Sequence, residues 1–206
     1  APRSALMTAY AYFYDDYNNR AISELINFFK KYPNDPNLPY AHYLLAMSYY
    51  NLIVDEKKDL EPLKNSQKQF KYIIENYPNT EFSLDSKFKL DLINEMIASK
   101  EMYIVRYYIQ KEKWIPAMNR LKFIVQEYSS TIFVEEALHR LVEIYYTIGI
   151  ESEAKKYANL LGYNYQSSEW YEKSFSVFNK KYKKDIIKDI KKENNSILEK
   201  FKSLFS

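Results

Sequence analysis

The chain has 206 residues, no cysteine, only two glycines, and 17% aromatic residues. The lack of cysteine excludes disulfides, iron–sulfur clusters and thiol catalysis, and the scarcity of glycine disfavours β-sandwiches, β-barrels and Rossmann folds, whose turns and phosphate loops need it. The net charge is +3, to which residues 179–206 contribute +5 (nine lysines against four acidic residues) and residues 1–178 contribute −2. Residues 1–178 therefore carry no basic stripe of the kind that would indicate nucleic-acid binding.

Residues 1–35 predict a first pair of helices. The first helix covers residues 4–14, and the second is an amphipathic segment that stops at Tyr32-Pro33, because proline cannot continue a helix. Residues 36–80 repeat this pattern and stop at Tyr77-Pro78. Between their two helices we expect a protruding loop at residues 54–62, since this unit is longer than the first.

Residues 81–131 predict a third pair, whose first helix runs from about residue 81 to 111 without glycine or proline. A helix of about 30 residues spans about 45 Å, and we expect it to act as a rigid brace. Residues 132–166 predict a fourth pair that ends in a turn at residues 162–165. Residues 167–206 are expected to form a helical extension that is basic and amphipathic from residue 179.

The four pairs share a pattern of small and large residues. Each first helix ends in tyrosines, and each second helix opens on a small residue with an apolar residue four positions later. The small residues are Ala21, Ser66, Ala117 and Ala154. This alternation is typical of the tetratricopeptide repeat (TPR). The predicted fold is therefore all-α, a TPR α-solenoid of about four helix pairs with a C-terminal helical extension.

Several stretches within residues 4–178 resemble the BamD family, the periplasmic lipoproteins of the outer-membrane β-barrel assembly (BAM) complex, in its α-proteobacterial form. They include residues 17–22, 43–50, 90–92, 100–108, 119–120, 136–143, 161–165 and 168–171. The resemblance implies a position at the periplasmic face of the outer membrane of a Gram-negative bacterium. It also implies five repeats, of which we expect this chain to hold the second to fifth, without the first repeat and the lipidated N-terminus that attaches the full-length protein.

The resemblance further implies docking on the last periplasmic (POTRA) domain of BamA, through the arginine at the position of Arg120 in the pair Asn119-Arg120. The residues themselves predict that Arg120 projects away from the packed stripe of Ala117, Leu121 and Ile124. An exposed arginine can pair with a carboxylate in a bidentate geometry, or it can be a solvated surface charge.

Aromatic residues supply the other candidate sites. Tyr107 and Tyr108 are either core residues of the repeat or present a ring on the docking face. Trp114 and Trp170 are either interface anchors or close the packing between units. A third set either lines a groove for unfolded outer-membrane β-barrel clients, in which the resemblance implicates the early repeats, or is ordinary packing. This set is Tyr10, Phe13, Tyr14, Tyr17 and Tyr40.

No motif of an enzyme is found. The two histidines, His42 and His139, lack the spacing of a zinc hydrolase, and there is no P-loop, G-x-S-x-G or G-x-G-x-x-G. Glutamates at positions 135, 136 and 143 lie at helical spacing from His139, which favours a surface ion pair over a metal site. We therefore expect no catalytic residue, no cofactor and no metal.

The predicted function is a non-enzymatic scaffold that docks on BamA, helps to receive unfolded clients and contacts other BAM lipoproteins. One alternative is another bacterial envelope TPR adaptor, which captures peptides on its concave face and does not need Arg120. A second is a lipid-binding module that rests on the basic segment from residue 179. That segment could instead cap the last repeat or contact a protein partner.

Overall fold

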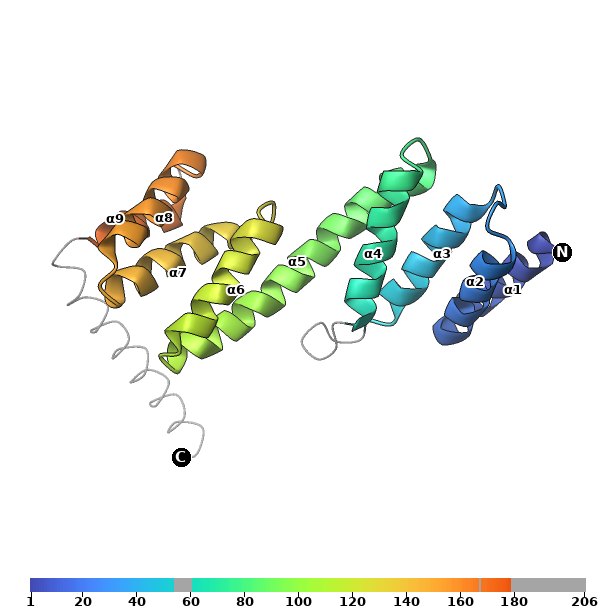
Figure 1. Cartoon of the computed structure of the whole chain (residues 1–206), viewed down its shortest axis with the longest axis horizontal. Helices are drawn as coiled ribbons and strands as arrows, with labels where there is room; N and C mark the ends of the chain where they lie inside the picture. Colours follow the sequence, from blue (N-terminus) through green and yellow to red (C-terminus); the bar gives the residue numbers. More distant parts are fainter. Residues whose placement is uncertain (54–60, 167, 179–206) are drawn as a thin grey trace, which may run out of the picture. The chain divides into compact units, whose positions relative to one another are not determined.

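The computed structural model describes residues 1–53, 61–166 and 168–178, and within these residues all regular secondary structure is α-helical. Consecutive helices follow one another in packed pairs (Figure 1). The helices are α1 (Pro2–Tyr14), α2 (Asn18–Lys31), α3 (Leu38–Asn51), α4 (Glu61–Asn76), α5 (Glu81–Gln110), α6 (Trp114–Glu127), α7 (Phe133–Thr147), α8 (Glu151–Asn164) and α9 (Glu169–Ser176). The predicted all-α, TPR-like fold class is confirmed for this part of the chain.

The chain forms two compact units, Ala1–Glu101 and Met102–Ser206, and the boundary between them falls inside α5. The 30-residue α5 agrees with the predicted long helix. Across the described residues, no helix combines the length and the hydrophobicity needed to cross a lipid bilayer.

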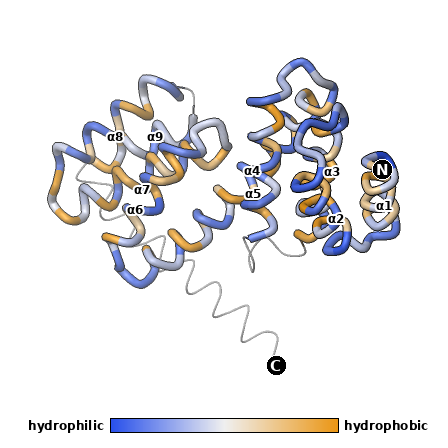
Figure 2. Tube along the Cα trace, turned by 45° about the vertical axis from the view of Figure 1, so that its right-hand side comes forward, coloured by the Kyte–Doolittle hydropathy of each residue, from blue (hydrophilic) through white to orange (hydrophobic). Residues whose placement is uncertain are grey.

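The small residues at the start of each second helix lie at the centre of the packing. All four are fully buried, and the residue four positions after each is buried as well: Leu25, Phe70, Leu121 and Ala158. Apolar and polar residues alternate along the helices, as expected for amphipathic packing (Figure 2). Ser66 remains satisfied in this position because its hydroxyl donates a hydrogen bond of 3.0 Å to the carbonyl of Ala46.

Three of the turns between paired helices share one backbone geometry. Asp16, Glu112 and Gly149 each adopt a left-handed conformation, with φ of 60°, 53° and 86°. The next N–H donates to a tyrosine carbonyl five residues earlier, at 2.8 Å from Tyr17 to Tyr12, 2.9 Å from Lys113 to Tyr108 and 2.8 Å from Ile150 to Tyr145. This is the Schellman motif, and it fixes how each second helix leaves the first.

The second helices α2 and α4 end just before the tyrosine of a Tyr-Pro pair, as predicted, and α6 and α8 also end just before a tyrosine. The N–H groups of Tyr32, Tyr77, Tyr128 and Tyr165 each bond to the carbonyl four residues earlier, and each helix ends at the preceding residue. The turn predicted at residues 162–165 is wrong, because α8 continues through Asn164. Of the expected loop at residues 54–62, residues 61–62 belong to the first turn of α4, where proline is tolerated. Residues 54–60 and the basic segment from 179 lie outside the described residues.

Gly162 lies inside α8 because α9 packs directly over it. A Cβ atom at this position would come within 2.6 Å of Cε2 of Tyr171, a ring atom in α9. The backbone conformation of residue 162 does not require glycine, since its φ is helical, whereas that of Gly149 is left-handed. The contact of α9 with α8 therefore depends on a residue without a side chain.

We expect Gly162→Ala to lower the free energy of unfolding by about 1 kcal/mol, because the cost of overpacking exceeds the gain in helix propensity. Urea unfolding followed by tryptophan fluorescence measures this, since Trp170 precedes Tyr171 in α9. In a Tyr171→Leu background the same substitution should cost less. An equal cost in both backgrounds would show that the ring is not the obstacle.

Candidate protein-docking site

Three of the four predicted docking residues form one cluster at the turn between α5 and α6. The guanidinium carbon of Arg120 lies 5.8 Å from the ring centroid of Tyr108, and the rings of Tyr107 and Tyr108 are 5.9 Å apart. Asn119 is exposed on α6 beside Arg120. The Schellman turn at Glu112 positions this cluster, because the carbonyl of Tyr108 itself accepts the hydrogen bond that closes the turn, from the N–H of Lys113.

The exposure of these residues bears on the interpretation of the two tyrosines as core residues. Tyr107 is 52% exposed and Tyr108 is partly buried, so neither is a core residue. The stripe of Ala117, Leu121 and Ile124 is fully buried, as predicted. Arg120 is partly buried, and its guanidinium makes a cation–π contact with the Tyr108 ring, a contact worth about 0.5–1 kcal/mol.

The cluster has the chemistry of a carboxylate-binding surface. A stacked guanidinium has fewer orientations to lose on binding, so its bidentate pairing with a carboxylate costs less entropy than that of a mobile arginine. Tyrosine adds a rigid apolar ring with a polar end, which suits an interface that is partly wet. The arrangement can therefore hold an acidic side chain of a protein partner.

Trp170 is a packing residue. It packs against the buried cluster of Val134, Leu138 and Leu161. Its ring also lies 5.3 Å from that of His139 and 4.5 Å from the ammonium of Lys173. Trp114 is partly buried at the first position of α6.

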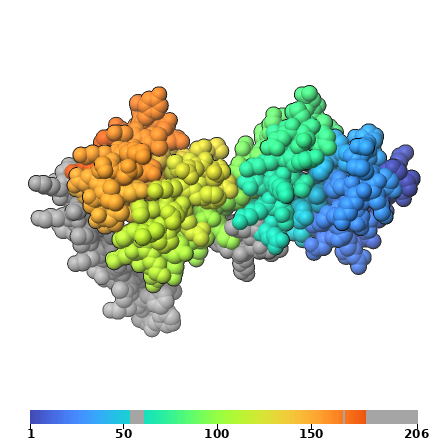
Figure 3. Space-filling view, viewed as in Figure 1, coloured from blue at the N-terminus to red at the C-terminus, as the bar shows by residue number. Residues whose placement is uncertain are grey.

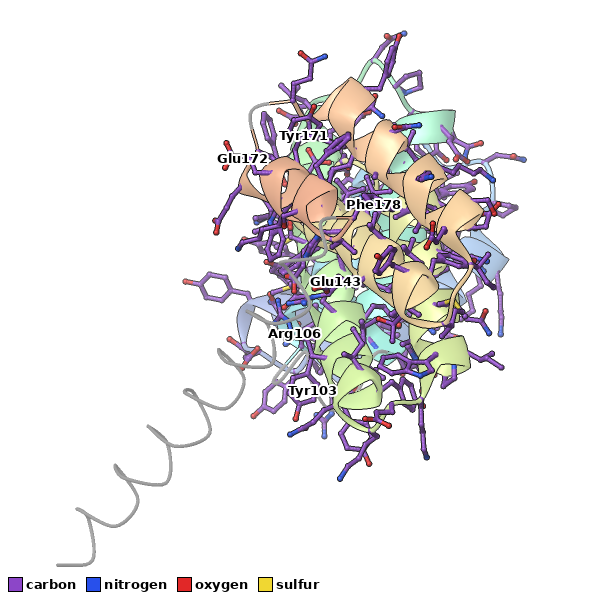
Figure 4. All side chains as sticks on the ribbon, turned by 90° about the vertical axis from the view of Figure 1, so that its left-hand side faces the viewer. Tyr103, Arg106, Glu143, Tyr171, Glu172 and Phe178 are labelled. Carbon is purple, nitrogen blue, oxygen red and sulfur yellow. The ribbon has the colours of Figure 1, made fainter. Side chains whose placement is uncertain are left out.

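A network of charged side chains joins α5, α7 and α9, and pairing across α5 and α7 was not predicted. Arg106 on α5 donates two hydrogen bonds to Glu136 on α7, at 2.7 and 3.3 Å. Arg140 pairs with Glu143 at 2.7 Å and with Glu136 at 3.5 Å. Figure 4 labels Arg106 and Glu143, which belong to this network. Residues 106 and 136 are 30 positions apart, so helical spacing could not have revealed their contact.

His139 corrects the expectation of a surface ion pair. Its side chain is only 2% exposed, its Nε2 lies 3.5 Å from Glu143, and its Nδ1 lies 2.9 Å from the hydroxyl of Ser174 on α9. The histidine is buried because α9 covers this part of α7. Among the described residues, no group of three histidine or acidic side chains is arranged to hold a metal ion.

The pKa of Glu143 is set by opposing effects. Burial alone raises it, but the hydrogen bond from His139 and the charges of His139 and Arg140 outweigh burial and lower the pKa from 4.5 to about 2. The carboxylate is therefore more stable in the folded chain than in the unfolded chain, and it pairs with two residues of its own helix, His139 and Arg140.

The candidate client residues do not form one surface. Tyr10 and Tyr14 lie on one face of α1, with ring centroids 6.2 Å apart, and are 39% and 77% exposed. Tyr40, on α3, is partly buried and packs against the core, with its ring 5.6 Å from that of Phe82. Phe13 packs against the buried core of α1–α3, and Tyr17 contacts the guanidinium of Arg20 instead.

Comparison with known proteins gives the family context of this geometry. Residues 1–161 match the YfiO family, described as an outer membrane lipoprotein. The chain is 40% identical over 176 residues to the outer membrane protein assembly factor BamD of Rickettsia prowazekii, and 36% identical over 177 residues to that of Caulobacter vibrioides. These matches cover 85% and 86% of this chain, and 70% and 58% of the two relatives. The BamD of Neisseria meningitidis serogroup A is 29% identical over 178 residues, which are 82% of this chain and 67% of that protein.

We expect the Glu143 carboxylate to contribute about 3 kcal/mol of stability at neutral pH. Because the folded pKa lies below the ordinary value, this contribution is complete above about pH 5 and is lost as the pH falls toward 2. Urea unfolding of the chain and of Glu143→Gln should therefore differ at pH 6 and converge at low pH.

Glu153→Gln is the matched control, since Glu153 forms an exposed pair with Lys156 at 3.5 Å. Its unfolding curve should follow that of the unsubstituted chain at every pH. A difference between the chain and Glu143→Gln that stays constant from pH 6 to 2 would contradict the assignment.

Proposed function

Because the chain belongs to the YfiO (BamD) family of outer membrane lipoproteins, we propose that it is a non-enzymatic scaffold subunit of outer-membrane protein assembly. It acts at the periplasmic face of the outer membrane. Its unit of residues 102–178 docks on the last periplasmic (POTRA) domain of BamA, and its unit of residues 1–101 helps to receive unfolded β-barrel clients. Membership of the family favours this function over an unrelated envelope adaptor.

The observation that carries the docking proposal is the cation–π contact of Arg120 with Tyr108 beside the exposed Tyr107. A stacked arginine next to exposed aromatic area is the composition found at the centre of protein interfaces. An acidic residue of BamA is the partner that this cluster fits, through charge-assisted hydrogen bonds from the guanidinium. Asn119 adds an amide at the edge of the same surface.

The client proposal rests on the exposed rings of Tyr10 and Tyr14 on α1, while Tyr40 lies on α3 and packs against the core. Exposed rings on one helix face suit the aromatic and aliphatic side chains of an extended peptide. Phe13 serves this surface only by supporting α1 from the core side. Other lipoproteins of the complex are further proposed partners, without an assigned surface on this chain.

We expect Arg120→Glu to weaken binding to the isolated last POTRA domain of BamA from the same organism by about 30-fold or more, because the proposed attraction between Arg120 and an acidic residue becomes a repulsion. Calorimetry measures this, with circular dichroism to show that the variant folds. Tyr108→Leu should weaken binding by about fivefold, since it removes the ring that orients the guanidinium.

Arg20→Glu is a matched control, because Arg20 also lies over tyrosine rings, 5.7 Å from Tyr12 and 5.4 Å from Tyr17, but in the other unit. It makes the same change of charge and should leave the affinity unchanged. Equal losses for Arg20→Glu and Arg120→Glu would point to a general charge effect and would reject this docking face.

A further inference from the structure

An open pocket lies on the unit of residues 1–101, between α2 and α4, and its floor is formed by α3. Its volume is about 410 Å³, within the range of ligand pockets. Figure 3 shows the three helices together on one face of this unit, in blue to green. The pocket includes none of the residues assigned above to BamA docking or to clients.

The floor of this α2–α4 pocket is apolar and rigid. His42 stacks on Phe29 with the ring centroids 4.2 Å apart and the planes 16° from parallel, and its ring lies 4.4 Å from that of Tyr72. The Nδ1 of His42 lies 3.1 Å from Oε1 of Gln69, so the imidazole donates to this amide oxygen. Ile26, which is 39% exposed, and Leu45 complete an apolar lining that is already formed without a ligand.

The charged part of the lining has a single sign. Lys30 on α2 and Lys68 on α4 are the charged residues among the nine that line the pocket, and none of the nine is acidic. Burial lowers the pKa of His42, so its ring stays neutral near pH 7. Neither lysine forms an ion pair within residues 1–53, 61–166 and 168–178. The pocket thus combines an apolar floor with two cations at its sides.

The apolar floor and the two lysines together indicate which kind of ligand fits the pocket. An apolar side chain can fill the floor, and carboxylates on either side of it can pair with the two lysines. Residues 179–206 of this chain are a poor match, since they carry a net charge of +5. A flat membrane surface is also a poor match, because the apolar contacts lie at the bottom of a concave site and not on a protruding face.

We propose that the α2–α4 pocket binds a hydrophobic side chain of an acidic segment in a partner protein. The recognition is that of a single anchor residue flanked by carboxylates. It places a second protein contact on the unit of residues 1–101, separate from the aromatic face of α1.

The test uses a fluorescein-labelled peptide, capped at both ends, in which one phenylalanine is flanked by two acidic residues on each side. We expect a Kd of about 0.1–1 mM with the whole chain, as for one anchor and screened charges. The chain has two histidines, so the ring protons of His42 should shift in NMR spectra on binding while those of His139 stay in place as an internal reference.

Two double variants make the test specific. Lys30→Glu with Lys68→Glu should weaken binding at least tenfold. Lys31→Glu with Lys71→Glu changes the net charge equally at exposed positions that do not line the pocket, and it should weaken binding less than twofold. A peptide with alanine in place of phenylalanine should bind at least fivefold more weakly to the unsubstituted chain.

Three outcomes would overturn the proposal. The first is no shift of the His42 resonances at 5 mM peptide. The second is an equal loss for the two double variants, which would mean general charge attraction. The third is binding of vesicles of phosphatidylglycerol that is lost with Lys30→Glu and Lys68→Glu while the peptide does not bind, which would assign the lysines to a lipid surface.

Discussion

The close approach of paired helices at four small residues is the constraint on which the rest of the structure depends. Ala21, Ser66, Ala117 and Ala154 are fully buried, and a larger side chain at any of them would push two helices apart. In the three pairs whose turn is a Schellman motif, the small residue lies four positions after the N-cap residue of the second helix. One repeated contact therefore fixes both the pairing of the helices and the direction in which each pair continues.

The candidate docking site follows from this geometry. In the turn at Glu112 the N–H of Lys113 donates a hydrogen bond to the carbonyl of Tyr108, and α6 then brings Arg120 back over the ring of the same residue. Asp16 forms the same turn in the first pair, where Arg20 contacts Tyr12 and Tyr17. Contact between arginine and tyrosine thus occurs in more than one repeat, and in both repeats an exposed tyrosine lies nearby, Tyr17 at 55% beside Arg20 and Tyr107 at 52% beside the Arg120–Tyr108 contact.

The charged network of α5, α7 and α9 has a different role. Glu136 and His139 are buried, so the ion pairs of Glu136 and the hydrogen bonds of His139 form where water does not screen them, and removing one partner leaves the other without compensation. The network explains why α9 can pack firmly with only eight residues: Ser174 bonds to His139, and Trp170 lies over Arg140. Gly162 completes this arrangement by making room for Tyr171.

The sequence by itself determined the helix pairs, their ends at tyrosine or proline, the long α5 and the buried stripe of α6, because these depend on periodicity and on local backbone chemistry. It also carried the residues that identify the family. Only the tertiary structure decided that His139 is buried, that Tyr107 is exposed, that Gly162 lies within a helix, and that Arg106 meets Glu136. Each of these depends on which helix packs over a given residue, and residues that meet across helices share no spacing along the chain.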